Sequence, residues 1–532
     1  MAFTDWRFLV LFLPGVLGLY FLVARLTSRG STDGRLRFHA ANWILVAGGL
    51  VFLAAGSGRF AGVLGTAALS LHLLGRGIAG AHRRPPATRP DRISAVPAIC
   101  FSLAVTGSLF LFAFFRFANP LAGEVLPWPD TLAAASFPVA GLLAPLGLAI
   151  FTCHAVSYAA DVHRGEAIAP RNPVHALTYL LLFPFLIAGP LVRFRDVSAH
   201  LAARQVGMAA FAYGVRRFTI GLAKVGLIAG TLAPPAELAF SMPADVLDAA
   251  HAWLGLACFS LQIHFALSGY ADMALGIGRM LGFRLPEHFQ WPYAADSLNA
   301  FWRRWSMTLT AWFDAYLRLP LQPPRGASAG GETRAALSLL LLFPLVAAWH
   351  GPGWPLLLWG AWHGAAVALE RTPWGALLAR LPAPFRHGYV LLVVTAGWIL
   401  FRADTAADAV VFVQALAGLG AAPSLNNPLP LTGGVQLALV VGAVAAAPLL
   451  PAVSRWSVTV DAIATALQMI VTAAAMFVWT RVLGVGRGAG APADDAERGA
   501  GARAGGADRG RAQRSDPNRD AADAGRASMP EP

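Results

Sequence analysis

Ionisable and hydrogen-bonding side chains gather between residues 260 and 363, in a chain whose remainder is mostly hydrocarbon. Among them, His350 closes an apolar run and stands directly before Gly351-Pro352, where a helix must end. An imidazole titrates near neutral pH, so it can accept a proton from a hydroxyl group or act as a nucleophile. Because polar groups are costly inside a bilayer, we interpret this stretch as the functional site.

The other polar residues of this stretch have a structural as well as a functional interpretation. His363 either lines a tunnel or forms hydrogen bonds within the helix bundle. Arg303 and Arg304 stand between Trp302 and Trp305. The two arginines either anchor the chain at the membrane interface or bind phosphate groups of a donor, for which the guanidinium fork is suited.

An acidic and a basic residue are spaced for pairing in the same stretch. Asp272 lies seven residues before Arg279, so both side chains share one face of an ideal helix. We expect a structural ion pair between them, because a lone carboxylate at membrane depth would be costly. His350 also has a structural alternative, a place in an aromatic belt beside Trp349 and Trp354. The three cysteines show no disulfide or metal-ligand spacing, and we predict no metal site.

Composition places the chain in a membrane. Of its 532 residues, 56% are hydrophobic and 13% are charged, whereas about 25% are charged in soluble domains. The net charge of +13 comes from arginines in short loops between apolar runs, which is typical of cytoplasmic loops and not of a nucleic-acid-binding surface. The sequence therefore predicts an all-α polytopic membrane protein and excludes soluble, fibrous and nucleic-acid-binding classes.

Apolar runs long enough to cross a bilayer recur along the chain. We expect about 11–12 transmembrane helices, from segments at 7–24, 41–55, 60–75, 93–117, 131–159, 206–230, 247–271, 335–349, 353–370, 387–401, 433–452 and 458–483. Proline and glycine interrupt the run at 174–192, which predicts a broken or re-entrant segment. The run at 298–318 mixes arginine and tryptophan at helical spacing, which predicts an interfacial or re-entrant amphipathic helix.

Charge and composition also predict orientation and domain limits. Basic loops at 25–37 and 83–92 favour a cytoplasmic side for these loops and an extracytoplasmic N-terminus, with an external loop at 118–130. The first apolar run lacks a basic start and a small-residue cleavage site, so we interpret it as a retained helix. Residues 1–484 are predicted to form the membrane domain. Residues 485–532 contain no aromatic residue and are predicted to be a disordered tail.

Short motifs follow one another along residues 1–420. They are PLG at 145–147, SYAAD at 157–161, IAGP at 187–190, SGYAD at 268–272, RMLGFRLPE at 279–287, FWRRW at 301–305, WHG at 349–351 and GWILFRAD at 397–404. Each alone is weakly specific. Together and in this order they resemble the membrane-bound O-acyltransferase family, in the branch of the alginate O-acetylation membrane protein and the D-alanyl transferase of teichoic acids.

The resemblance implies a fold, a reaction and a catalytic residue. Tilted helices would surround a central tunnel in which a cytoplasmic acyl donor meets an acceptor from the other side. The family's WHG histidine is taken as catalytic, and it corresponds to His350. The expected donor is acyl-CoA, in particular acetyl-CoA, or another thioester, and no tightly bound cofactor is expected. The expected partners are the lipid bilayer, a periplasmic acetyltransferase and a polysaccharide acceptor such as alginate, at a bacterial inner membrane.

Some positions depart from the motifs that are usual in this family. Ser306 stands where relatives have a second active-site polar residue, histidine or asparagine/aspartate, directly after FWRRW. His288 replaces the asparagine of the usual PENF, and Ala266 replaces the acidic residue of the usual FDFSGY. A serine at 306 can form a hydrogen bond with a substrate or with His350, but it cannot act as a base at neutral pH.

Three classes of function are therefore weighed. The leading one is an O-acyltransferase that moves acetyl toward an extracytoplasmic polysaccharide. The departures at Ser306 and Ala266 motivate a second class, a non-catalytic acyl-conducting or scaffolding subunit of a polysaccharide-modification complex. A small-molecule transporter is the third, and it would predict matching broken helices in two halves, of which the sequence shows no sign.

Overall fold

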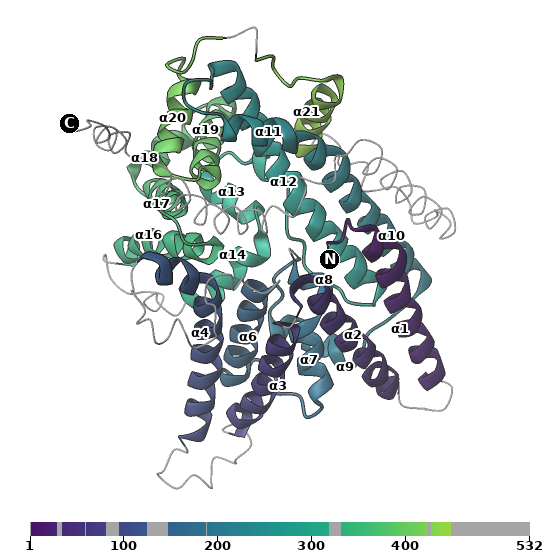
Figure 1. Ribbon diagram of the computed structural model, residues 1–532. Coiled ribbons are helices and arrows are strands. Elements are labelled where there is room, and N and C mark those ends of the chain that lie inside the picture. The colour runs from purple at the N-terminus through teal and green to yellow at the C-terminus, as the bar shows by residue number, and fades with distance from the viewer. Residues whose placement is uncertain are drawn as a thin grey trace, which may run out of the picture. The chain divides into compact units, whose positions relative to one another are not determined.

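The fold was examined in a computed structural model (Figure 1) that describes residues 2–28, 34–58, 60–80, 95–124, 147–187, 189–318, 331–423 and 427–447. Every regular element within these residues is a helix. Seven are long and apolar enough to cross a membrane: Phe8–Thr27, Phe38–Ser57, Phe60–Ile78, Val96–Phe117, Met208–Ser241, Ala249–Met280 and Ala383–Arg402. The predicted all-α polytopic class is confirmed. The predicted helix at 458–483 and the predicted tail at 485–532 lie outside the described residues.

The N-terminal part begins with a π-helical turn and continues in four long helices. They are η1 (Phe8–Phe12), α1 (Leu13–Ser28), α2 (Gly34–Ser57), α3 (Phe60–Ile78) and α4 (Val96–Glu124). Helices α2 and α3 form a hairpin that turns at Gly58, whose φ of +55° suits a glycine. Helix α4 continues to Glu124, so the external loop predicted at 118–130 is helical over its first half.

Shorter helices follow, and they include the predicted break. They are α6 (Leu148–His163), α7 (Pro173–Leu181), α8 (Phe183–Leu186) and α9 (Phe194–Ala202). Asn172 caps α7, because its side chain accepts a hydrogen bond of 3.0 Å from the backbone N–H of Val174. Leu182 is extended and separates α7 from α8, so the interruption expected within 174–192 is observed.

The centre of the fold contains a close pair of long helices. The first consists of α10 (Met208–Ala223), a π-helical turn η4 (Lys224–Ala229) and α11 (Gly230–Ser241), and the second is α12 (Ala249–Met280). The helix expected to end at 230 therefore continues through two prolines to Ser241. A Cβ added at Gly276 would lie 2.6 Å from the carbonyl oxygen of Gly214 on α10. Glycine at such positions lets two helix backbones approach closely.

The region after α12 departs from the prediction of one helix at 298–318. It consists of η5 (Pro292–Ala294), α13 (Leu298–Arg304), α14 (Met307–Phe313) and η6 (Asp314–Arg318). The break falls at Trp305-Ser306, because Ser306 has a φ of +46°, which no right-handed helix contains. In Figure 1, α13 and α14 lie between α12 and the next two helices, α16 (Gly331–His350) and α17 (Trp354–Leu369).

The last described helices are α18 (Pro373–Ala379), α19 (Ala383–Arg402), α20 (Ala406–Leu416) and α21 (Gly433–Ala446). A buried apolar cluster joins α12 with α19, α20 and α21 and includes Phe259, Trp305, Trp359, Trp398 and Phe412. Aromatic residues of α13, α17 and α19 thus meet in one core, and both predicted active-site histidines adjoin it.

Candidate active site

His350 is the last residue of α16, and aromatic rings surround it. The ring centroid of His350 lies 4.8 Å from Trp349, 5.5 Å from Phe401 and 5.7 Å from Trp359. The side chain is half-buried. A Cβ added at the next residue, Gly351, would lie 2.6 Å from a guanidinium nitrogen of Arg116 on α4. The imidazole is therefore held by packing, and a positive charge lies beside the turn that follows it.

Close packing of α16 on α17 brings the two predicted histidines near one another. Gly360 permits this approach, since a Cβ there would lie 2.6 Å from the carbonyl oxygen of Phe343. The ring of Trp359 lies between the histidines, 5.7 Å from His350 and 5.5 Å from His363. His350 and His363 thus both adjoin the ring of Trp359.

His363 is fully buried and is surrounded by aromatic rings. The nearest is Trp302 of α13, at a centroid distance of 4.9 Å. Neither ring nitrogen of His363 has a hydrogen-bond partner among the described residues. The hydrogen bonding that we considered for this residue within the bundle is therefore not observed in that part of the chain.

The indole nitrogens beside His363 also lack hydrogen-bond partners among the described residues. Those of Trp302 and Trp359 are buried, and in the part of the chain that the structure describes neither donates a hydrogen bond. Buried polar atoms in proteins are nearly always paired. Trp302, Trp359 and His363 thus carry unused hydrogen-bonding capacity close to His350, as do buried side chains elsewhere in the described residues, such as both ring nitrogens of His154.

Ser306 contacts a histidine, but this histidine is not His350. Its Oγ lies 3.2 Å from Nε2 of His288, in the loop between α12 and α13 and outside the candidate membrane spans. Nδ1 of His288 lies 2.7 Å from Oγ1 of Thr308, which accepts a hydrogen bond of 2.8 Å from the backbone N–H of Leu191. Burial lowers the pKa of His288 to about 4, against the opposing effect of the negative charge of Asp272.

The trio Arg303, Arg304 and Trp305, predicted to bind a donor or to lie at the interface, does not share one environment. Trp305 is 5% exposed and packs against Phe301 and Trp398, at centroid distances of 5.5 and 4.9 Å. It is a core residue. The Arg303 side chain is exposed and that of Arg304 is half-buried.

The predicted ion pair of Asp272 with Arg279 is wrong. Oδ1 of Asp272 lies 2.6 Å from Nη2 of Arg217, and Oδ2 lies 2.7 Å from Nζ of Lys224. Arg217 also binds Glu287. Residues seven apart on a helix share a face but lie about 10 Å apart along the axis. The neighbouring α10 supplies a closer cation, so Asp272 is a structural polar residue with different partners.

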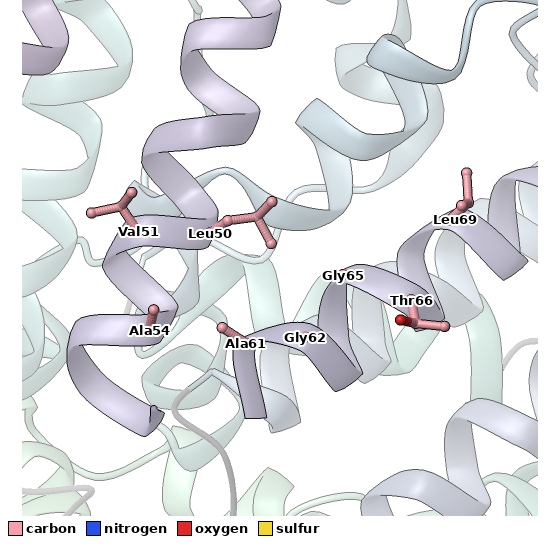
Figure 2. Close-up of a pocket in the computed structure, with 8 residues that line it drawn as sticks. All are labelled: Leu50, Val51, Ala54, Ala61, Gly62, Gly65, Thr66 and Leu69. Atoms are coloured by element: carbon pink, nitrogen blue, oxygen red, sulfur yellow. The ribbon is translucent and has the colours of Figure 1, made fainter. Parts of the chain in front are cut away.

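Arg279 instead lines a cleft of 390 Å³ at the end of α12. The cleft is also lined by Tyr213, Arg217, Leu275, Phe283, Arg284, Leu285 and Glu287. A second hollow, of 540 Å³, lies between α2 and α3 and is lined by Leu50, Val51, Ala54, Ala61, Gly62, Gly65, Thr66 and Leu69 (Figure 2). Its lining is apolar except for one hydroxyl group, so it offers no acid or base. Neither hollow is lined by His350.

His264 of α12 is a further buried histidine near this site, and no motif of the sequence indicated it. This side chain is 5% exposed, and its ring lies 5.4 Å from Tyr293 and 5.8 Å from Trp305. It therefore adjoins the same aromatic core as His363. The available signal was a histidine within a long apolar helix, four residues before Ser268 of the SGYAD motif.

Comparison with known proteins covers this whole region. Residues 142–394 match the family model of MBOAT, the membrane-bound O-acyltransferase family. The chain is 33% identical over 404 residues to a probable alginate O-acetylase of Azotobacter vinelandii, across 76% of this chain and 75% of that protein. It is 28% identical over 348 residues to a peptidoglycan O-acetyltransferase of Helicobacter pylori, across 60% and 64%. It is 24% identical over 304 residues to a teichoic acid D-alanyltransferase of Bacillus subtilis, across 54% and 76%.

Proposed function

The chain belongs to the membrane-bound O-acyltransferase family and is an O-acyltransferase, and from this premise we propose its donor, its acceptor and its catalytic residue. It moves an acyl group, expected to be acetyl, from a cytoplasmic thioester toward an extracytoplasmic polysaccharide. His350 is the catalytic histidine. The observation that carries this proposal is the WHG histidine at the end of α16, next to a cluster of buried nitrogens without partners.

The arrangement fits acyl transfer by general base catalysis. The imidazole of His350 accepts the proton of an attacking hydroxyl group, and the hydroxyl oxygen bonds to the thioester carbonyl carbon. The carbon–sulfur bond then breaks, and the thiolate leaves with the proton from the imidazolium. The indole N–H groups of Trp302 and Trp359 are available to donate to the carbonyl oxygen, on which negative charge develops.

The names of the relatives support the choice of acceptor. One is a probable alginate O-acetylase and another is a peptidoglycan O-acetyltransferase, and both names specify a polysaccharide. We propose acetyl-CoA as the donor, with Arg303 and Arg304 as candidate contacts for its phosphates. We also propose a place in a bacterial inner membrane with an extracytoplasmic N-terminus, and a periplasmic acetyltransferase as the partner that completes the transfer.

The test is complementation of a strain that lacks this protein, with acetyl groups on surface polysaccharide measured by mass spectrometry. We expect His350→Ala to reduce acetylation by roughly 10²–10⁴-fold, which is the usual contribution of a positioned base. His387→Ala is the matched control, because the contacts of this half-buried histidine of α19 within the described residues are with backbone carbonyl oxygens outside the site. Equal acetylation by His350→Ala and the unaltered protein would refute the catalytic assignment.

A scaffolding or acyl-conducting role is the second candidate, because Ser306 and Ala266 depart from the usual motifs. The same experiment separates the two. A scaffold would support acetylation with His350 replaced, whereas loss of the whole chain would abolish it. Equal membrane levels of both variants, measured by immunoblotting, are required for the comparison.

A further inference from the structure

The cleft of 390 Å³ that Arg279 lines lies at the end of α12, beside the first turns of α10. Gly214 near the start of α10 faces Gly276 near the end of α12, so the two helices run antiparallel. The candidate membrane span of α12 ends at Met280, and that of α10 begins at Met208. In a bilayer, the ends of such spans lie at the level of the lipid headgroups. We therefore expect the cleft to open at this level.

One wall of the cleft carries charges that balance. Arg217 binds the carboxylates of Asp272 and Glu287, and Lys224 binds the other oxygen of Asp272. These two cations and two carboxylates offset each other. An excess of charge in the cleft must therefore come from the remainder of its lining.

Two further arginines of the cleft lack such partners. Within the described residues, the side chains of Arg279 and Arg284 form neither an ion pair nor a hydrogen bond. Arg279 is half-buried in the last turn of α12, and Arg284 is exposed. The cleft thus keeps two positive charges that no carboxylate in the described part of the chain neutralises.

The backbone after α12 brings these two arginines to one cleft. The N–H of Phe283 donates to the carbonyl oxygen of Gly278 at 2.8 Å. The N–H of Gly282 donates to the carbonyl oxygen of Arg279 at 3.1 Å. With a φ of +89° at Gly282, these bonds form a Schellman motif, which turns the chain sharply at the helix end. Arg284 follows this turn and therefore lines the same cleft as Arg279.

Phe283 holds the turn in place. Its side chain is fully buried, and the guanidinium carbon of Arg204 lies 4.4 Å from the centroid of its ring. The same guanidinium donates to the carbonyl oxygen of Leu281 at 3.0 Å and to Oδ1 of Asn42 at 2.7 Å. The two arginines of the cleft are therefore presented by a fixed turn, and a ligand does not have to order the backbone.

The chemistry of this lining matches a phosphate ester. A planar guanidinium donates in pairs to phosphate oxygens, and two of them offset the charge of one phosphate group. Leu275, Phe283 and Leu285 give the cleft an apolar part as well, and its volume lies within the range of small-molecule sites. We propose that the cleft binds a phosphate ester. Arg279 and Arg284 contact the phosphate, and the apolar side chains contact the group that it carries.

Two sources share this chemistry, an anionic phospholipid and the phosphates of the thioester donor. The place of the cleft at the ends of two candidate spans favours the phospholipid, because arginines at the membrane surface attract anionic lipids. The donor as ligand rests on the proposed function, whereas lipid binding does not depend on it. The test therefore measures the two ligands separately.

The full chain is purified in detergent and titrated with phosphatidylglycerol, and bound lipid is counted by native mass spectrometry, with phosphatidylcholine as the zwitterionic reference. In a second arm, coenzyme A is titrated into the protein in nanodiscs of phosphatidylcholine. We expect Arg279→Gln and Arg284→Gln each to weaken phosphatidylglycerol binding about fivefold, and the double variant about 30-fold. The same loss confined to coenzyme A would assign the phosphate site to the donor instead.

A double variant of Arg371→Gln and Arg380→Gln is the matched control, because it removes the same charge from two exposed arginines outside the cleft. It should leave both affinities within about twofold of the unaltered protein. General attraction between the protein's net positive charge and an anion would instead weaken binding equally in both double variants.

Glu287→Gln should have the opposite effect. It removes the negative charge from the lining of the cleft, so we expect binding to strengthen about fivefold. A misfolded protein would not show such a gain.

Unchanged affinity of the Arg279 and Arg284 double variant for both ligands would overturn the proposal, as would an equal loss in the control or weaker binding by Glu287→Gln. These outcomes are distinct from a failure of the proposed function. Acetylation that does not depend on His350 would refute the catalytic assignment without changing either binding result.

Discussion

Between α10 and α12, the buried carboxylate of Asp272 contacts two cations, Arg217 and Lys224. Around α13 and α17, by contrast, the buried nitrogens of Trp302 and His363 have no hydrogen-bond partner among the described residues. The hydrocarbon core of a bilayer offers no water to satisfy polar groups. A polar group that stabilises the fold must therefore find its partner within the protein. One without a partner is costly.

The presence or absence of a partner distinguishes two kinds of polar residue within the stretch 260–363, which the sequence alone does not distinguish. Asp272 and His363 are both rare ionisable residues in apolar helices. The first is neutralised by its neighbours and holds α10 to α12. The second is enclosed by aromatic rings, and neither of its nitrogens has a hydrogen-bond partner in the described part of the chain.

The largest effect on stability is expected between α10 and α12, where Asp272 forms its ion pairs. Asp272→Ala removes the counter-charge of Lys224 and one of the two counter-charges of Arg217, which keeps Glu287. Loss of one partner of a buried ion pair costs roughly 3–5 kcal/mol, and we expect the low end, because the two cations keep 22% and 29% exposure. Denaturant or thermal unfolding of the purified protein measures this loss.

Glu287→Gln is the matched control for Asp272→Ala, because Glu287 binds the same Arg217 from a side chain that is 53% exposed. Exposed ion pairs contribute about 1 kcal/mol or less. Equal destabilisation by both variants would remove the distinction between a buried structural pair and a surface pair.

A smaller effect is expected where α16 packs on α17. In Gly360→Ala the added Cβ would lie 2.6 Å from the Phe343 carbonyl oxygen and 2.9 Å from Cβ of Ala347, so the helices must separate. Overpacking of this kind costs about 1–3 kcal/mol. It should also lower acetyl transfer, because His350 and His363 lie on opposite sides of this contact. Gly388→Ala is the control, since open space surrounds Gly388 of α19; a loss of stability there as well would refute the packing explanation.

The sequence predicted the class of fold, because apolar runs and motif order are local properties. It left two roles open for His363, one in a tunnel and one in the helix bundle. It did not predict the partners of Asp272. Helical spacing identifies residues that share one face of a helix. The cation nearest to Asp272 lies on the neighbouring α10 instead, and the close approach of α10 to α12 depends on glycines of both helices. The helix expected at 298–318 was wrong for a similar reason. The turn at Ser306 is imposed by hydrogen bonds from a loop 18 residues earlier, and no local pattern reports such a bond.

A further prediction concerns His288, whose nitrogens are both hydrogen-bonded, in contrast to those of His363. Burial lowers the pKa of His288 to about 4, below the ordinary value of 6.5. The unfolded chain therefore binds more protons between these values, so this group makes stability fall as the pH falls from 6.5 toward 4. From pH 6 to pH 5 we expect a loss of about 1 kcal/mol that His288→Asn no longer shows. An identical pH dependence in both proteins would contradict the buried neutral state.

The smallest effect on stability is expected for His363→Phe. Its nitrogens lose no hydrogen bond among the described residues, and a phenyl ring preserves the contacts with Trp302 and Trp359. Replacement of an unpaired polar group by an apolar one of the same shape is close to neutral or stabilising. We expect an unchanged or higher unfolding temperature together with reduced acetyl transfer, which assigns the nitrogens to a substrate. A marked drop in unfolding temperature would instead show that His363 holds the bundle together, and the contrast with Asp272 would not stand.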